Sequence, residues 1–202
     1  MPERAGVSVE YPAPWFGFPL DPGVDVDRWA GSKAEELLLA SNGEDVPEIT
    51  RVLRPRASDL RAELGKRARA YRQRGPAHAL GCYPPGVDTS DVGMEISRRI
   101  PAGCVDPARP AGGVAVHDAG EPLVEEGGTG AGPLTRIRWN ARGERRPWFG
   151  GRPVIRALTH VIRPRATTVP VVAHTVWTDP GLDEYIEPWA DGIAETIRVT
   201  SR

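Results

Sequence analysis

Apolar residues recur at helical spacing in three stretches of the chain. Residues 25–41 begin with aspartates that can cap a helix, and residues 58–73 are followed by a glycine, a typical helix end. A third stretch follows Asp179 and Pro180, a capping residue and a proline suited to the first helical turn. The expected buried positions are Trp29, Ala30, Ala34, Leu37 and Leu38 in the first helix, Leu60, Leu64, Ala68 and Tyr71 in the second, and Leu182, Tyr185, Ile186, Trp189 and Ile193 in the third. Pro188 interrupts the third pattern and predicts a kink or a short break there.

Short runs of β-branched, aromatic and other apolar residues predict one strand before the first helix and several after the second. The last three strands are joined by polar turns that contain Gly or Pro, which favours an antiparallel meander. Residues 103–133 are rich in Gly, Ala, Pro and acidic residues and predict a flexible insertion with one short strand at 113–117. The first ten residues predict a frayed lead-in. The predicted strands cover residues 14–20, 77–83, 94–100, 134–140, 154–163 and 169–178.

These elements predict one domain over residues 1–202, with an α+β fold in which an antiparallel β-sheet is flanked by helices. The formal net charge of -1 gives no basic surplus, which argues against nucleic acid as a partner. No apolar stretch is long enough to cross a bilayer, and the N-terminus lacks the apolar region of a signal peptide. We therefore expect a cytoplasmic protein without membrane insertion. Cys82 and Cys104 lack metal-ligand spacing and are expected to be free thiols.

The sequence contains no recognisable catalytic motif. It has no GxSxG elbow, and the glycine-rich run at 127–132 lacks the GK[ST] ending of a phosphate-binding loop, so a flexible loop is the favoured interpretation. Acidic pairs such as Glu125-Glu126 are adjacent in sequence, whereas acid–base catalysis needs carboxylates that converge across a cleft. We assign no catalytic residue, cofactor-binding residue or metal ligand from the sequence, and expect a protein that is not an enzyme and needs no cofactor.

Two histidines form the strongest candidate for a metal site. If the strands at 154–163 and 169–178 pair through a tight connection, Leu158 faces His174 and His160 faces Val172. Both histidines would then project from one sheet face as diagonal neighbours. Because the sequence offers no obvious third and fourth ligand, we favour ordinary sheet residues at both positions.

One tetrapeptide, Pro-Trp-Phe-Gly, occurs at 14–17 and again at 147–150. The second copy lies between two predicted strands, where arginines surround it. Large aromatic and arginine side chains are enriched at binding hot spots, so this segment is a candidate partner-docking tip. The alternative, which the sequence favours, is that the aromatic side chains fold back on the sheet edge. The residues of the candidate tip are Trp148, Phe149, Arg145, Arg146 and Arg152.

The predicted helix at 58–73 is rich in basic residues, with Arg61, Lys66, Arg67, Arg69 and Arg72 within it and Arg74 just beyond. Such a face can hold an acidic partner or nucleic acid. A charge run of this kind is more often a solvated helix face, and the neutral overall charge supports that interpretation.

The end of the chain resembles a known superfamily. The segment from Trp177 to Val199 contains TDPGLDEYIEPWADGIAETIRV and resembles the terminal strand and helix of the PsbP-like superfamily, which includes the Mog-type Ran-binding proteins. Actinobacterial members often close with a strand, a Thr-x-Pro element, an amphipathic helix and Ile-Arg-Val. The strand pair from Arg152 to Arg163 also looks similar. The resemblance covers residues 14–100 loosely and 134–199 better, while the insertion at 103–133 departs from it.

The resemblance implies an antiparallel sheet flanked by helices and a non-enzymatic role. Known relatives bind a GTPase, a photosystem or, in the Eag chaperones, the apolar helices of secreted effectors, and some occur near type VII secretion genes. The leading hypothesis is therefore a protein-binding accessory or chaperone-like factor associated with a secretion system, with a protein partner. Two alternatives stay open: a small-molecule-binding protein or enzyme that uses a cavity between sheet and helices, and a structural subunit of a larger assembly.

Overall fold

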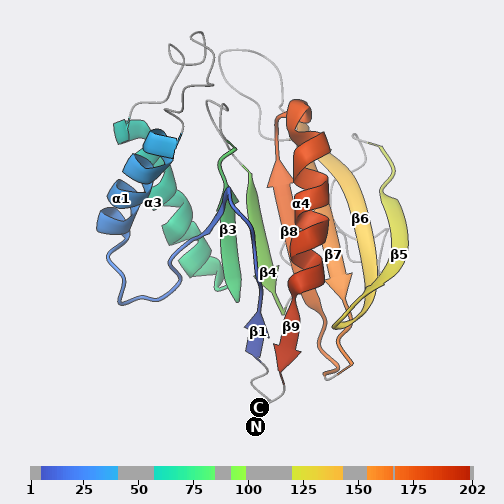
Figure 1. Ribbon diagram of the computed structural model, residues 1–202. Coiled ribbons are helices and arrows are strands. Elements are labelled where there is room, and N and C mark those ends of the chain that lie inside the picture. Colours follow the sequence, from blue (N-terminus) through green and yellow to red (C-terminus); the bar gives the residue numbers. More distant parts are fainter. Residues whose placement is uncertain are drawn as a thin grey trace. The chain divides into compact units, whose positions relative to one another are not determined.

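The computed structural model describes residues 6–40, 57–84, 92–98, 120–142, 154–165 and 167–200 (Figure 1). As predicted, the chain is an α+β protein with an antiparallel β-sheet and helices packed against strands. It divides into two compact units, formed by residues 12–92 and by residues 1–11 with 93–202, a division that the hydrophobic pattern does not indicate. No helix within the described ranges is long and apolar enough to cross a membrane.

The smaller unit packs two helices against a strand pair. Helices α1 (Val26–Ala40) and α3 (Ala57–Arg74) confirm the two predicted helices, and strands β2 (Trp15–Gly17) and β3 (His78–Cys82) pair antiparallel. Asp25 caps α1 by accepting hydrogen bonds from the next backbone N–H groups, which also lowers the pKa of its carboxyl. The predicted stripes form the core together with Phe16 and Phe18: Ala30, Ala34, Leu37, Leu60, Leu64, Ala68 and Tyr71 are buried, while Trp29 and Leu38, also predicted, are partly buried and pack against them.

Three arginines of α3 form hydrogen bonds or ion pairs with other residues of the smaller unit. Arg72 donates to the carbonyls of Pro19 and Val24, and Arg69 pairs with Asp27 at 2.7 Å. Arg67 donates to a backbone carbonyl near the end of the unit. A long guanidinium side chain at a helix surface thus fixes irregular backbone whose carbonyls need donors. This part of the arginine-rich face is therefore engaged within the chain, where the charge pattern favoured a solvated face.

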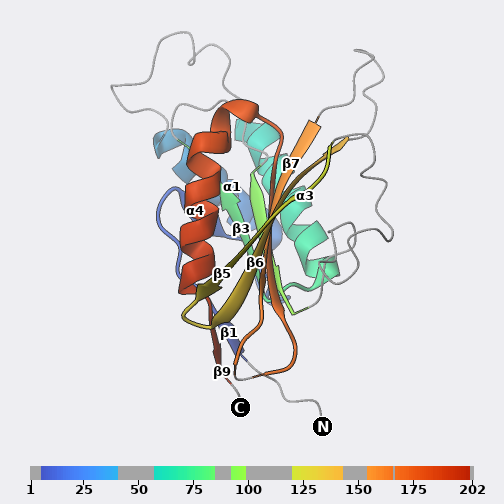
Figure 2. The same ribbon diagram turned by 90° about the vertical axis from the view of Figure 1, so that its right-hand side faces the viewer.

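The larger unit is built on a five-stranded antiparallel arrangement in the order β4-β8-β7-β6-β5. Its strands are β4 (Gly93–Ser97), β5 (Leu123–Thr129), β6 (Gly132–Arg142), β7 (Val154–Ile162) and β8 (Val171–Trp177). The last three form the predicted meander, since β6 pairs β7 and β7 pairs β8. Figure 2 shows these strands nearly edge-on, with the terminal helix along one face.

Two segments at the edges of this unit differ from the predictions. Residues 123–129, expected within a flexible insertion, form β5 and make a hairpin with β6. The expected strand at 113–117 lies outside the described residues. Near the N-terminus, β1 (Gly6–Ser8) pairs with β9 (Arg198–Thr200), where a frayed lead-in was expected. In both cases the partner strand supplies hydrogen bonds that local composition does not reveal.

The terminal helix begins as predicted. Asp179 caps a short 3-10 turn, η1 (Pro180–Leu182), by accepting from the Gly181 N–H, and α4 (Asp183–Thr196) follows directly. The helix runs through Pro188 without the expected break. Pro188 lies inside the helix and removes one i→i−4 hydrogen bond, and the remaining bonds of the ladder continue the helix past it.

The buried face of the terminal helix agrees with the prediction at Leu182, Ile186 and Ile193 and differs from it at the two aromatic positions. Ile186, Ala190, Ile193 and Ala194 are buried, whereas Tyr185 is 57% exposed and Trp189 is only partly buried. Residues one position apart differ by about 100° around a helix, so the stripe through Ile186 leaves Tyr185 on the outer flank. Alanines occupy part of the buried side of the helix, and the two large aromatics lie outside it, with Tyr185 exposed and Trp189 at its margin.

Candidate functional site

The two candidate histidines lie on opposite faces of the sheet. Thr159 pairs with His174, and His160 pairs with Ala173, so the register differs by one residue from the predicted one. Because side chains alternate along a strand, a slip of one residue moves every side chain of a strand to the other face relative to its partner. The predicted same-face arrangement of His160 and His174 is therefore wrong. Within the described ranges, no three His, Cys, Asp or Glu side chains converge as a metal site requires.

His174 ends a chain of hydrogen bonds on the face opposite α4. The Trp139 Nε1–H donates to the Thr159 hydroxyl, which lies 3.0 Å from His174 Nδ1. The His174 and Trp139 rings also stack, with centroids 6.0 Å apart. Burial lowers the pKa of the His174 imidazole from 6.5 to about 4. At neutral pH the ring is therefore uncharged and accepts the Thr159 hydrogen bond.

This arrangement predicts a loss of stability in weak acid. The imidazole of His174 becomes protonated near pH 6.5 in the unfolded chain but only near pH 4 in the folded chain. The free energy of unfolding should therefore fall between pH 6.5 and pH 4 and stay constant below pH 4. The full difference corresponds to about 3 kcal/mol, and because the ring is partly solvent-accessible we expect about 2 kcal/mol. Urea unfolding from pH 7 to 4 measures it.

The matched control is His174→Gln, which keeps an acceptor for Thr159 but does not titrate. Its free energy of unfolding should change less than that of the natural chain over the same window. Parallel pH profiles for the two proteins would show that His174 does not carry the effect.

On the sheet face opposite His174, a cluster of charged residues connects α4 to the sheet. Arg136 of β6 forms ion pairs with Glu125 at 2.7 Å, Glu187 at 2.7 Å and Asp191 at 2.9 Å. Burial by itself lowers the pKa of the guanidinium, but the hydrogen bonds to Asp191 and Glu187 outweigh it and raise the pKa above its ordinary value. Arg136 therefore stays charged and connects β5, β6 and α4.

His160 belongs to the same cluster. Its Nε2 lies 2.6 Å from the Asp191 carboxylate, which fixes the proton on that nitrogen. Burial raises the pKa of Asp191, but the hydrogen bonds from His160 and Arg136 outweigh it and hold the pKa below its usual range. His160 is completely buried, and its Nδ1 has no partner among the described residues. A ring that substrate cannot reach does not serve as a general base, so this pair fastens the helix to the sheet.

The outer surface of α4 is the best candidate for a binding surface. Outside the buried side of the helix, four residues follow each other at helical spacing: Tyr185, Pro188 and Gly192, which are exposed, and Trp189, which is partly buried. We call them the α4 stripe. The rings of Tyr185 and Trp189 contact each other, with centroids 6.3 Å apart. A Cβ atom built on Gly192 would meet nothing within 4 Å. Among the described residues, packing therefore gives no reason for this helix-weakening glycine, while a close approach from outside would.

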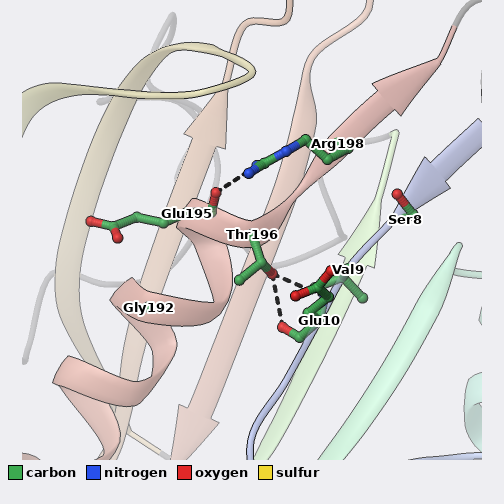
Figure 3. A pocket seen from close by; sticks show the side chains of 7 residues that line it. All are labelled: Ser8, Val9, Glu10, Gly192, Glu195, Thr196 and Arg198. Atoms are coloured by element: carbon green, nitrogen blue, oxygen red, sulfur yellow. Dashed lines mark hydrogen bonds between the residues drawn. The ribbon is translucent and has the colours of Figure 1, made fainter.

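The α4 stripe leads into a hollow of about 340 Å³ at the end of the helix (Figure 3). The Thr196 hydroxyl accepts from the Glu10 N–H at 3.0 Å and lies 2.8 Å from the carbonyls of Glu10 and Ile193. Arg198 donates to the Glu195 carbonyl at 2.7 Å, which satisfies the last turn of the helix. The hollow is lined by Ser8, Val9, Glu10, Gly192, Glu195, Thr196 and Arg198. These hydrogen bonds between side chains and backbone atoms fix the positions of the residues that line the hollow.

The residues of the predicted docking tip, Trp148, Phe149, Arg145, Arg146 and Arg152, lie outside the described residues. Cys82 is a buried thiol, and burial raises its pKa to about 12, which leaves it unreactive. Cys104 also lies outside the described residues. Sequence reasoning missed the α4 stripe because it assigned Tyr185 and Trp189 to the core. The buried pair Ala190 and Ala194 was the available signal, since it completes an alternative stripe with Ile186 and Ile193.

Comparison with known proteins leaves the family open. No protein-family model matches the chain, and no curated protein matches it. The evidence for a role is therefore the geometry itself. Kinship with the PsbP-like superfamily stays a prediction from the closing sequence.

Proposed function

We propose that this protein is a non-enzymatic, cytoplasmic protein-binding accessory factor, whose kinship is PsbP-like and whose partner docks on the α4 stripe. The observation that carries the proposal is the contact between the exposed Tyr185 ring and the partly buried Trp189 ring, beside the open Gly192. Trp and Tyr supply large contact areas at low entropic cost and dominate binding hot spots. A role in secretion comes only from the sequence resemblance and belongs to the same proposal.

The described hollows favour a protein partner over a small molecule. The hollow beside Gly192 is open and its side chains are largely polar or charged. A second hollow of about 230 Å³ is lined by Leu123, Trp139 and Trp177 together with polar and charged residues, among which Arg138 pairs with Glu187 and Arg156 with Asp183. Small-molecule sites are usually enclosed and mainly apolar. We therefore favour a protein over a small molecule as the partner that binds the α4 stripe.

Site-directed photo-crosslinking in the native cell tests the proposal. A photoreactive phenylalanine analogue at Tyr185 should give one dominant adduct with a protein, identified by mass spectrometry. The matched control places the same analogue at Leu39, an apolar residue of α1 that is 72% exposed. Equal adducts at both positions, or none at Tyr185, would contradict the proposal.

Two substitutions at Gly192 distinguish an effect on partner docking from an effect on the stability of the fold. Gly192→Ala should raise the free energy of unfolding by about 0.5–1 kcal/mol, because alanine favours helix and its methyl group meets no described atom. The bulkier Gly192→Gln should fold as well but reduce the Tyr185 adduct at least about tenfold, since its side chain blocks a close approach. Chemical unfolding and adduct yield measure the two effects. An unchanged adduct yield in Gly192→Gln would exclude docking across this position.

A further inference from the structure

Strand β5 leaves one edge of the sheet open. It is the terminal strand in the order of the larger unit, and its pairing partner among the described residues is β6 alone. Every residue of β5 except Thr129 is exposed, and its two apolar residues, Leu123 and Val124, are 45% and 52% exposed. An open edge presents unpaired backbone N–H and C=O groups to which another strand can add.

The hairpin register shows which backbone groups point outward. Thr129 pairs with Gly132 across a two-residue turn, so Gly128 pairs with Pro133. The Pro133 carbonyl accepts from the Arg163 N–H at 2.9 Å, on the side away from β5. The Gly128–Pro133 pair is therefore the non-hydrogen-bonded kind, and this kind recurs at every second residue. The outward-facing backbone groups of β5 are those of Val124, Glu126 and Gly128.

The negative charge of the β5 edge restricts which strands can pair with it. Glu121, Glu125 and Glu126 are all exposed, and β5 itself contains no basic residue. Arg136 pairs with Glu125, while Glu126 accepts a hydrogen bond from the neutral Thr135 hydroxyl. A second copy of β5, added antiparallel, would bring glutamates of both copies face to face, which is unfavourable. A strand rich in lysine or arginine would instead meet carboxylates.

We propose that the β5 edge accepts an extended, basic segment of a partner protein as an added strand. Backbone hydrogen bonds to Val124, Glu126 and Gly128 supply the general affinity, and the exposed carboxylates of Glu121 and Glu126 select the charge. Leu123 also lines the hollow of about 230 Å³ that contains Glu121, Asp183 and Glu187, so the hollow opens beside the first residue of the edge. This edge and the α4 stripe are different surfaces, so the inference does not depend on docking at Tyr185.

A designed peptide tests the proposal on the full chain. The probe is a fluorescent peptide of about nine residues, long enough to cover β5, in which Lys or Arg alternates with Val. Anisotropy titration should show binding that weakens with salt. Two further peptides serve as controls: one with N-methyl groups on alternate backbone nitrogens, which keeps the charge but blocks strand pairing, and one with Glu in place of the basic residues. Both should bind at least about tenfold more weakly.

Matched variants locate the site. Val124→Pro removes an outward N–H without touching the bonds to β6, and should weaken the basic peptide at least about tenfold. Val124→Thr removes the apolar side chain but keeps the N–H, and should bind within about threefold of the natural chain. If Val124→Pro does not fold, the N-methylated peptide decides the question.

Three outcomes would overturn the proposal: equal binding of the N-methylated peptide, equal binding of the acidic peptide, or no binding of the basic peptide. Self-association of the chain through β5, lost in Val124→Pro, would also overturn it. Tyr185→Ser should leave peptide affinity unchanged. Failure of the α4 stripe and failure of the β5 edge are therefore distinguishable.

Discussion

Arg136→Leu should lower the free energy of unfolding by about 3 kcal/mol, because it leaves the carboxylates of Glu187 and Asp191 close together without their shared cation. The Arg136 side chain is only 16% exposed, so solvent replaces little of the lost interaction. Urea unfolding at neutral pH measures the effect. Arg136 helps to hold the pKa of the Asp191 carboxyl below its usual range, so its stabilising effect is lost as that carboxyl protonates, and the difference from the natural chain should narrow in acid.

Arg138→Leu is the matched control for this prediction. Arg138 lies two residues along the same strand and on the same face, but it is 49% exposed and forms a longer ion pair with Glu187, at 3.2 Å. Exposed ion pairs contribute little, so we expect a loss below about 1 kcal/mol. Similar losses in the two variants would show that the Arg136 cluster does not hold α4 on the sheet.

Gly132→Ala should lower the free energy of unfolding by about 3 kcal/mol, through the sum of steric crowding and backbone strain. Gly132 is the first residue of β6, with a φ of +157°. A Cβ atom at this position would lie 2.2 Å from the carbonyl oxygen of Arg163, which is backbone and has little freedom to move. Neighbouring backbone hydrogen bonds, from Arg163 N to Pro133 O and from Arg165 N to Ala131 O, hold the two segments together. Thermal and urea unfolding measure the loss.

Gly127→Ala provides the comparison within the same glycine-rich run. A Cβ atom on Gly127 meets nothing within 4 Å, so this change should alter the free energy of unfolding by less than about 1 kcal/mol. Two equal effects would mean that the run is simply flexible, as its composition suggested. Unequal effects would show that Gly132 is required by a close backbone approach.

The helices and the central meander were predictable because their signals are local. The stripe through Ala30, Ala34 and Leu37 and the cap at Asp25 define α1 without knowledge of any partner. Strands β6, β7 and β8 alternate or concentrate apolar residues between turn-forming segments, and they pair in chain order. In each case the residues that specify the element lie within the element.

Edges and registers were not predictable in the same way. Strand β5 is glycine-rich and acidic, and it is a strand because β6 offers it a ladder of hydrogen bonds. The pairing of Thr159 with His174 depends on how residues 163–170 close the β7–β8 connection, a property of the loop and not of the strands. The candidate surfaces follow the same rule, since the α4 stripe is exposed only because alanines occupy the buried side of the helix.

The sequence by itself therefore determined the α+β class, the helix caps and which segments alternate apolar with polar positions, because these depend on contacts between residues close in the chain. Only the tertiary structure decided that His160 and His174 face opposite ways, that Arg136 pairs with three carboxylates, and that Tyr185 is exposed while Trp189 is only partly buried. Those outcomes depend on packing and register between segments that are far apart in the chain. A shift of one residue turns a strand's side chains to the other face of the sheet, and it turns a helix by about 100°, so that buried and exposed positions are exchanged.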